Sequence, residues 1–515
     1  MKSHSITLWI LCMLLLQACS SRTIETVIVD NQPDTPSAPE IMEAADQESI
    51  DNVLRIGEVN NITGFDPLFA LNPASQRAIQ LIYEGLVTLD EQDDIKPAIA
   101  KRWQISSDSL QYTFYLDKST YYHDDESFNS GIGRRVRASD FKQAFERMAS
   151  RDVPPNAAEL FVDHISGFEA YFYEQREVYQ PEERTLDQID GIQANNDSTL
   201  TFTLIERDPD FLYKLASPFA VVYPQEALRR RTNGLKDHPV GTGPFSFGAS
   251  SGDTLYILNR NTDYRITDEN EVLQKPKRVE ILNLEDEARI FRQFALGRLN
   301  VIMELGPQMI QTLVNSDNEL EISYREQYEL GVIDHKESYI VRYNPNNKHG
   351  LDSRHASTLA NILPFDSLKA NLGNPSLQLI YQADGQDDES SLDDLKQRFT
   401  QGREGQSLIL AFGSDLSAQL LSAQIINQYK KDFKAVLMDQ RVFSRNIFLY
   451  LDQQTRYTPH HQTETLPQEI LRFDKDRYYL INNNIDGIGF NSYSWWLNLN
   501  DARVSENVSL SNHVN

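Results

Sequence analysis

VGTGPF, residues 240–245, is the stretch around which the other sequence signals of this chain are ordered. It contains a Gly-x-Gly pair, yet it lacks the third glycine and the following helix of a dinucleotide-binding loop. Just downstream, GASSG at residues 248–252 fits the G-x-S-x-G string of many hydrolases. A nucleophile elbow needs a helix next, whereas residues 253–260 are predicted as a strand, which indicates a hairpin turn. We therefore expect no nucleotide cofactor, no catalytic serine and no enzyme activity.

Short phrases on both sides of this stretch carry a family resemblance through their order. They are FDPL at 65–68, YEGL at 83–86, PAIA at 97–100, YHDD at 122–125, VRASDF at 136–141, DPDFL at 208–212, LASP at 215–218 and LNRN at 258–261. The ordered set resembles the extracytoplasmic solute-binding proteins of the peptide/nickel ABC importer family, the oligopeptide- and dipeptide-binding proteins. The resemblance covers about residues 52–345.

This resemblance implies an α/β protein with the two-lobed fold of periplasmic binding proteins, of type II and of the large peptide-binding subclass. Lobe I would comprise residues 52–343, with an inserted subdomain at about 87–205. Lobe II would comprise residues 344–480, and residues 481–515 would return to lobe I and end in a C-terminal tail. In such proteins the ligand is buried between the lobes and undergoes no chemistry.

The resemblance also implies hinge strands, near residues 339–343 and near residues 479–484, about which the lobes close over the ligand. Peptide binders of this family hold the main chain of the ligand with strand-like hydrogen bonds and leave its side chains in wet pockets. The glycines of the turn would supply positive φ angles and close packing beside the hinge. This structural turn consists of Gly241, Thr242, Gly243 and Pro244.

Hydrophobic periodicity independently indicates a mixed α/β chain. Alternating apolar residues predict strands at 111–117 and 199–205, and Ser139 is expected to cap a helix. A strand–helix–strand unit, which favours a parallel pair of strands, is predicted at residues 407–412, 416–429 and 434–438.

The N-terminal segment is expected to direct the chain out of the cytoplasm. Residues 1–18 have a basic start and an apolar stretch too short to span a bilayer comfortably, and they resemble a bacterial lipoprotein signal peptide. Cys19 would then carry lipid, and residues 19–51 would form a flexible tether. The alternative is an ordinary cleaved signal with a chance cysteine. Cys12 lies inside the signal, so Cys19 would remain as a single exported cysteine, which lipidation explains.

Composition limits the partners. Formal net charge is −26, from 49 basic and 75 acidic residues, which argues against nucleic-acid binding. His460 and His461 form the only histidine pair, and without further ligands at metal spacing they predict no metal site. We expect a monomer without cofactors in the cell envelope, anchored by lipid on the periplasmic side, with a peptide or similar small solute and the ABC permease subunits as partners.

Five residues are expected to face the cleft by position, and two of them have defined alternatives. Glu304 would pair with a cationic group of the ligand, or else be a solvated surface acid. Arg342 would clamp a carboxylate, or else form an ion pair between the lobes. The full set is Leu71, Asn72, Glu304, Arg342 and Tyr343.

The second lobe departs from the family pattern. The Trp/Asp/Tyr-rich segment of peptide binders has no counterpart, and its place reads YTPHHQ at residues 457–462. Pro364 would break the helix expected after Arg354. The leading hypothesis is a lipid-anchored substrate-binding component of an ABC importer. The shortened lobe motivates an alternative, a family-derived envelope lipoprotein with a degenerate ligand site that acts as a sensor, scaffold or interaction protein.

Overall fold

The computed structural model forms two units, residues 1–50 and residues 51–515, and all of the described residues belong to the second. The described residues are 52–230, 232–264, 275–284, 286–363, 365–372, 376–383, 389–400, 407–412, 416–439, 448–455, 457, 459 and 468–504. The predicted signal, Cys19 and the tether lie outside them.

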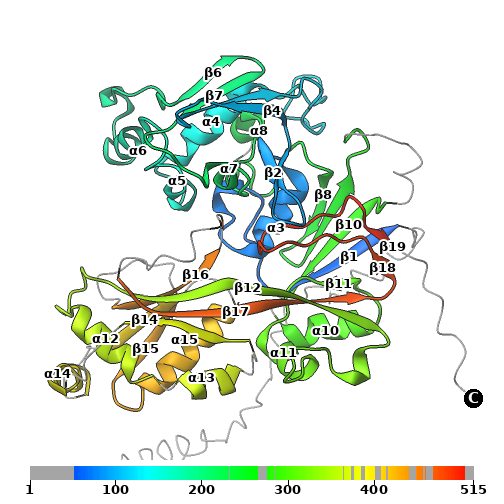
Figure 1. Cartoon of the computed structure of the whole chain (residues 1–515). Coiled ribbons are helices and arrows are strands. Elements are labelled where there is room, and N and C mark those ends of the chain that lie inside the picture. Colours follow the sequence, from blue (N-terminus) through cyan, green and yellow to red (C-terminus); the bar gives the residue numbers. More distant parts are fainter. Residues whose placement is uncertain are drawn as a thin grey trace, which may run out of the picture. The chain divides into compact units, whose positions relative to one another are not determined.

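One long sheet runs through the described chain, and its two longest strands lie side by side near its middle (Figure 1). In sheet order the strands are β15 (Ala435–Asp439), β14 (Leu408–Phe412), β16 (Leu449–Thr455), β12 (Tyr328–Tyr343), β17 (Glu469–Asn482), β11 (Val301–Ile302), β1 (Val53–Glu58), β10 (Arg278–Asn283), β9 (Leu255–Arg260) and β8 (Phe245–Ser251), with β13 (Gln378–Gln382) also paired to β17.

Smaller sheets and helices complete the fold. The small sheets pair β4 (Ala100–Ile105), β5 (Gln111–Leu116), β7 (Thr199–Thr203) and β6 (Ile192–Asn196) in that order, β2 (Val87–Leu89) with β3 (Ile95–Pro97), and β18 (Ile485–Asp486) with β19 (Arg503–Val504). Helices before β12 are η1 (Pro67–Phe69), α3 (Pro73–Ile82), α4 (Ala138–Met148), α5 (Asn156–Glu159), α6 (Phe168–Glu177), η2 (Pro181–Glu183), α7 (Phe211–Leu215), α8 (Gln225–Arg230), α10 (Glu287–Ala295), α11 (Pro307–Leu313) and η3 (Ile322–Tyr324). Helices after β12 are α12 (Ser353–Asn361), α13 (Phe365–Leu372), α14 (Glu389–Thr400) and α15 (Leu416–Tyr429).

Two hydrophobic cores define two lobes. The first combines buried side chains of β1, α3, α4, β5 and the segment 493–502, so the four-stranded sheet belongs to the same core as β1. The second combines buried side chains of β12, β14, β17, α12 and α15. We call the elements of the first core lobe I, and the elements between β12 and β17 in sequence lobe II. The expected two-lobed α/β fold is confirmed.

Strands β12 and β17 take part in both lobes (Figure 1). At one end residues Tyr328–Ile333 pair with residues 477–482 of β17, which also pairs with β11 of lobe I. At the other end residues 337–342 pair with 469–475, and β12 also pairs with the antiparallel strand β16 of lobe II. The register shifts between Ile333 and Glu337, where extra β12 residues oppose β17. A shift of this kind interrupts the ladder and permits a local bend between the two paired ends.

Most expected elements are confirmed, with a shift at one cap. Strands β5 and β7 lie where alternation predicted them, and β14, α15 and β15 form the predicted unit with β14 parallel to β15. Ser139, however, does not cap α4: the cap residue is Arg137, and Asp140 accepts a hydrogen bond from its backbone N–H at 2.9 Å. The G-x-S-x-G string lies mainly on β8, which forms an antiparallel hairpin with β9. No helix follows it, so the hairpin interpretation holds.

The turn at Gly241–Pro244 is held by the end of α3, and of the two reasons expected for its glycines only close packing applies, not a positive φ angle. Neither Gly241 nor Gly243 has a positive φ angle, so that expectation was wrong. A Cβ atom on Gly241 would lie 2.0 Å from the carbonyl oxygen of Ile82, and the Gly243 N–H donates to that same oxygen at 2.8 Å. His123 reaches the turn from the other side, with its N–H on the Gly241 carbonyl at 2.8 Å. Close backbone approach, not backbone conformation, selects glycine here.

We predict that Gly241→Ala lowers the free energy of unfolding by about 3 kcal/mol or more, because the new methyl group meets fixed backbone rather than a movable side chain. Gly252→Ala is the comparison. Gly252 has a φ of +55° but nothing within 4 Å of an added Cβ, so only conformational strain of about 1 kcal/mol is expected. Urea unfolding measures both changes, and an equal or smaller loss for Gly241→Ala would contradict the packing argument.

Candidate functional site

A buried chain of charges lies where lobe I meets the long strands. Its centre is Arg77 on α3, a helix in which nine of the ten residues are buried and which Asn72 caps. The Arg77 guanidinium forms a bidentate pair with Glu58 of β1, at 2.8 Å for Nε and 2.7 Å for Nη2. Its Nη1 donates to the carbonyl oxygen of Ser494 at 2.7 Å. Arg77 and Glu58 are each only 2% exposed, so the pair is shielded from water.

Glu304 extends this charge chain toward the second lobe. It follows β11, is 2% exposed, and accepts a hydrogen bond from Asn60 Nδ2 at 3.0 Å. Its Oε2 lies 3.9 Å from Arg77 Nη2, and its Oε1 lies 3.8 Å from Nζ of Lys475. The alternative of a solvated surface acid is therefore wrong. Burial beside two cations explains why this carboxylate is tolerated inside the fold.

Lys475 links the charge chain to the strands shared by both lobes. It lies on β17 opposite Glu337 of β12, at the end of the register shift, and is 6% exposed. Its Nζ is 5.2 Å from the ring centroid of Tyr339, whose side chain belongs to the second core. Lys475 thus stands between a carboxylate of lobe I and an aromatic ring of lobe II.

A second contact joins the lobes through Tyr457. This residue lies between β16 and β17 in sequence, yet its ring packs against the first core, 5.5 Å from the ring of Phe219. Gln76 Nε2 donates to the Tyr457 hydroxyl at 2.7 Å and to the Ala70 carbonyl at 2.9 Å. Within the described part of the chain, the buried Gln76 Oε1 has no hydrogen-bond partner. Gln76 Oε1 is thus a buried acceptor that could receive a hydrogen bond from an N–H group of a molecule bound between the lobes.

The loop before α3 presents apolar side chains near this contact. Leu71 is 45% exposed and Phe69 is 40% exposed, although Leu68 beside them is fully buried. Asn72, predicted to face the cleft, is instead 3% exposed. Its Oδ1 accepts from the Ser75 N–H at 2.9 Å and its Nδ2 donates to the Asn61 carbonyl at 2.9 Å. Asn72 therefore positions the loop, while Leu71 remains available for contact.

The two predicted residues on β12 lie among lobe II side chains. The Arg342 guanidinium carbon lies 4.9 Å from the ring centroid of Tyr450, on the neighbouring strand β16. Tyr343 packs against the second core with its ring 6.3 Å from that of Phe448. The structure thus brings Glu304 to the meeting of the lobes, leaves Leu71 exposed beside it, and places Arg342 and Tyr343 in lobe II packing.

Sequence reasoning missed Gln76, Arg77, Tyr457 and Lys475. Arg77 carried a usable signal, because it is the single charged residue of α3 and most of the helix around it is apolar or small. Lys475 and Tyr457 carried none, since only the pairing of distant segments brings them to lobe I.

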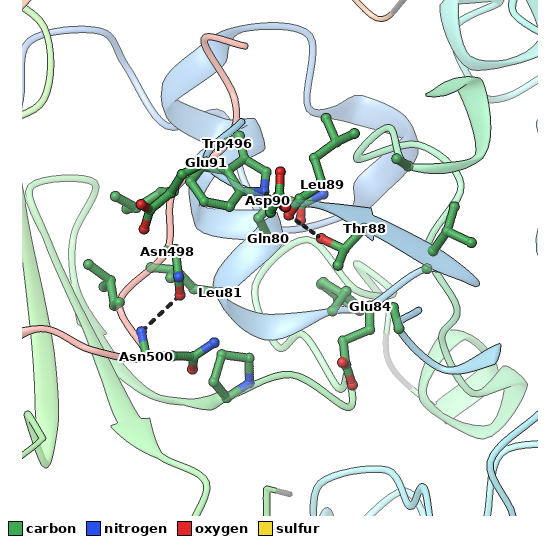
Figure 2. A pocket seen from close by; sticks show the side chains of 18 of the residues that line it. Gln80, Leu81, Glu84, Thr88, Leu89, Asp90, Glu91, Trp496, Asn498 and Asn500 are labelled. Atoms are coloured by element: carbon green, nitrogen blue, oxygen red, sulfur yellow. Dashed lines mark hydrogen bonds between the residues drawn. The ribbon is translucent and has the colours of Figure 1, made fainter. Parts of the chain in front are cut away.

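A separate cavity of about 310 Å³ lies within lobe I, between α3, the β2–β3 hairpin and the C-terminal segment (Figure 2). The Trp496 Nε1 donates to the Leu89 carbonyl at 3.0 Å, and the Asn500 N–H donates to Asn498 Oδ1 at 3.0 Å (Figure 2). Glu84 on the cavity wall accepts from the hydroxyl groups of Tyr264 and Thr242, both at 3.0 Å. The Trp496 bond fastens the C-terminal segment to β2, and the Thr242 bond fastens the turn of Gly241–Pro244 to Glu84, whereas the Asn500 bond is internal to the C-terminal segment.

The described residues contain no cluster of three or more His, Cys, Asp or Glu side chains suited to a metal ion. In the same residues, no helix has the length and apolar character needed to cross a bilayer.

The two lobes share the long strands β12 and β17. Where the lobes meet lie an exposed apolar loop, with Phe69 and Leu71, and the buried Gln76 Oε1 that has no hydrogen-bond partner in the described chain. This architecture is that of a two-lobed binding protein of the periplasmic type. The family described as bacterial extracellular solute-binding proteins, family 5 (middle), matches residues 94–365, just over half of the chain. The chain belongs to this family.

Curated relatives agree with that assignment, and solved structures share the fold. The chain is 26% identical over 298 residues to the dipeptide-binding protein DppE of Bacillus subtilis (strain 168), covering 58% of this chain and 49% of DppE. It is 25% identical over 304 residues to di/tripeptide-binding protein 1 of Pseudomonas aeruginosa (strain UCBPP-PA14), covering 58% and 52%. The chain thus spans about half the length of the curated relatives it matches. A periplasmic oligopeptide-binding protein from Borrelia burgdorferi has a similar fold, with a TM-score of 0.68 at 15% identity, covering 88% of this chain and 100% of that one.

The buried charge chain yields a stability prediction. Arg77→Met leaves the carboxylates of Glu58 and Glu304 buried without their main cation, so unfolding should become easier by about 3–5 kcal/mol. Arg325→Met is the matched control, since its pair with Glu319 is largely exposed and should contribute little. Thermal or urea unfolding compares the two variants. If Arg77→Met lowered the free energy of unfolding as little as Arg325→Met, the charge chain would not stabilise the fold.

Proposed function

We propose that this protein is the lipid-anchored substrate-binding component of an ABC importer and captures peptides between its two lobes. Lipid on Cys19 would hold it at the extracytoplasmic face of a bacterial membrane, where it passes its ligand to the permease as a monomer. The family assignment supports the binding role. The names of the relatives, which bind dipeptides and di/tripeptides, favour a peptide over other solutes.

The observation that carries the proposal is the pair of strands β12 and β17, which supply side chains to the second core, join the sheet of lobe I through β11, and contain a register shift between them. Such a connection allows the lobes to approach one another while each core stays packed, which is how hinge closure buries a ligand. Interlobe contacts through Lys475 and Tyr457 lie on the lobe faces that would close on the ligand.

Within this proposal, the loop of Phe69 and Leu71 would receive an apolar side chain of the peptide. Gln76 Oε1, which has no partner among the described residues, would accept an N–H group of the peptide main chain. Glu304 already has Asn60, Arg77 and Lys475 around it, so its role would be to position those groups rather than to meet the ligand directly.

The test is binding of peptides, followed by a mutation at the proposed contact. Pools of di- to hexapeptides should raise the unfolding temperature of the protein, because a ligand at 100 times its Kd adds about 2.7 kcal/mol of stability. Leu71→Glu should weaken binding of apolar peptides by about tenfold or more, since it replaces apolar burial with a desolvated charge.

Ile132→Glu serves as the control for that variant, because Ile132 is also an exposed apolar residue, at 64%, but lies in the β5–α4 connection. Equal affinities of the Leu71 and Ile132 variants would place the peptide elsewhere. Absence of stabilisation by peptides, sugars or Ni²⁺ would overturn the capture role and favour the alternative of an envelope lipoprotein with a degenerate site. The alternative is favoured by the hydrogen bond between Gln76 of lobe I and Tyr457 of lobe II, because this contact already fills part of the space between the lobes.

A further inference from the structure

An open cavity of about 790 Å³ lies in the region of α4, α6 and α8, away from the strands shared by the lobes (Figure 1). Its volume falls in the range of small-molecule pockets. Four arginines line it, against two carboxylates, in a chain whose net charge is −26. They are Arg147, Arg151, Arg184 and Arg229.

One of the four has its charge balanced inside the fold. The Arg147 guanidinium forms a bidentate pair with Asp66, at 2.9 Å for Nη1 and 2.5 Å for Nη2. It also lies 5.4 Å from the ring centroid of Tyr223. Arg147 is therefore a structural arginine at the wall of the cavity.

The other three have no carboxylate partner within 4.0 Å among the described residues. Arg184 donates to the carbonyl oxygens of Val178 and Gln175 and to Gln175 Oε1. Arg151 donates Nε to the Arg176 carbonyl at 2.9 Å and stacks on Tyr179, with its guanidinium carbon 3.7 Å from the ring centroid. Stacking on Tyr179 orients the Arg151 guanidinium, and its Nη1 and Nη2 have no hydrogen-bond acceptor among the described residues. Carbonyl partners fix these guanidinium groups without neutralising their charge.

Arg229 stands between this cavity and a smaller one of about 410 Å³. Both carboxylates that line the smaller cavity form ion pairs with Arg134, Asp140 at 2.8 Å and Glu226 at 2.7 Å. Exposed Arg137 and Arg229 have no ion pair in the described residues, so positive charge remains on this side as well.

The two carboxylates of the larger cavity offset only part of this charge. Asp152 accepts a short hydrogen bond from the Ser150 hydroxyl, which lowers the pKa of Asp152 and keeps it negatively charged, so it balances one of the three arginines at most. Glu146 lies 3.7 Å from Lys142, which supplies its own counter-charge. Arg151 and Arg184 are held in place by these contacts, and Arg229 is exposed on α8 at the same cavity. Arginines without a carboxylate partner are suited to phosphate groups, because the planar guanidinium offers paired donors.

We propose that this arginine cavity binds a small polyanion carrying phosphate groups, independently of the ligand between the lobes. The phosphate could belong to a soluble molecule or to a lipid headgroup, and the recognising chemistry is the same. Arg151 and Arg229 would provide the contacts, while Arg184 would add positive charge.

The experiment titrates the protein with inorganic pyrophosphate by calorimetry, and in a second arm floats it with phosphatidylcholine vesicles with and without phosphatidylglycerol. Lipid-dependent flotation is measured on protein with Cys19→Ser, so that an N-terminal lipid does not decide the result. The double variant Arg151→Gln/Arg229→Gln should weaken whichever binding is observed by about tenfold or more. The single variant Arg229→Gln should also weaken this binding. Because Arg229 is exposed and has no ion pair in the described chain, this variant should fold normally, so it tests the proposal even if the double variant folds poorly.

The control is Arg102→Gln/Arg207→Gln, which changes the net charge equally. Arg102 stacks on Tyr115 at 3.7 Å and Arg207 donates to the Asp108 carbonyl, so both resemble Arg151 without lining the cavity. Binding of pyrophosphate alone identifies a soluble ligand, and flotation alone identifies a headgroup. The proposal is overturned if neither is bound, or if the control pair weakens binding as much as the cavity pair.

Discussion

Both lobes depend on one constraint, the pairing of β12 with β17 on both sides of a register shift. These strands supply side chains to the second core and, through β11, join the sheet of the first. Backbone hydrogen bonds must be satisfied along their whole length, so the two lobes cannot separate without breaking the ladder. The register shift between Ile333 and Glu337 is the one break in that ladder that lies between the two cores, and a break of this kind permits bending there.

The buried charges follow from the same constraint. Because β17 passes beside β11, Lys475 comes near Glu304, and Glu304 in turn lies beside Arg77 and Asn60. Buried ion pairs contribute little net stability but strongly penalise the loss of a partner. Their effect here is to fix how α3 and the loop of Leu71 meet the shared strands, which is where a guest molecule would be enclosed.

Local patterns in the sequence predicted local structure well. Alternation located β5 and β7, and the order of short phrases identified the family that residues 94–365 confirm. Contacts between residues far apart in the sequence were harder to predict. Gly241 was expected both for a positive φ angle and for close packing, and only the second holds, because the carbonyl of Ile82 excludes a side chain there. Asn72 and Glu304 were chosen by position, and only the packed structure shows that a helix cap and a buried charge chain use them. Tyr457 was not foreseeable, because its partner Gln76 is 381 positions away.

Motion of the lobes about β12 and β17 is the central claim, and a distance between them tests it most directly. Spin labels at exposed Ile322 of lobe I and exposed Lys430 of lobe II, with Cys12 and Cys19 replaced by serine, report that distance by pulsed electron resonance. Addition of a pool of di- to hexapeptides should shift the distribution toward a single, narrower population as the lobes close. An unchanged distribution, together with peptide binding seen by calorimetry, would contradict the hinge account.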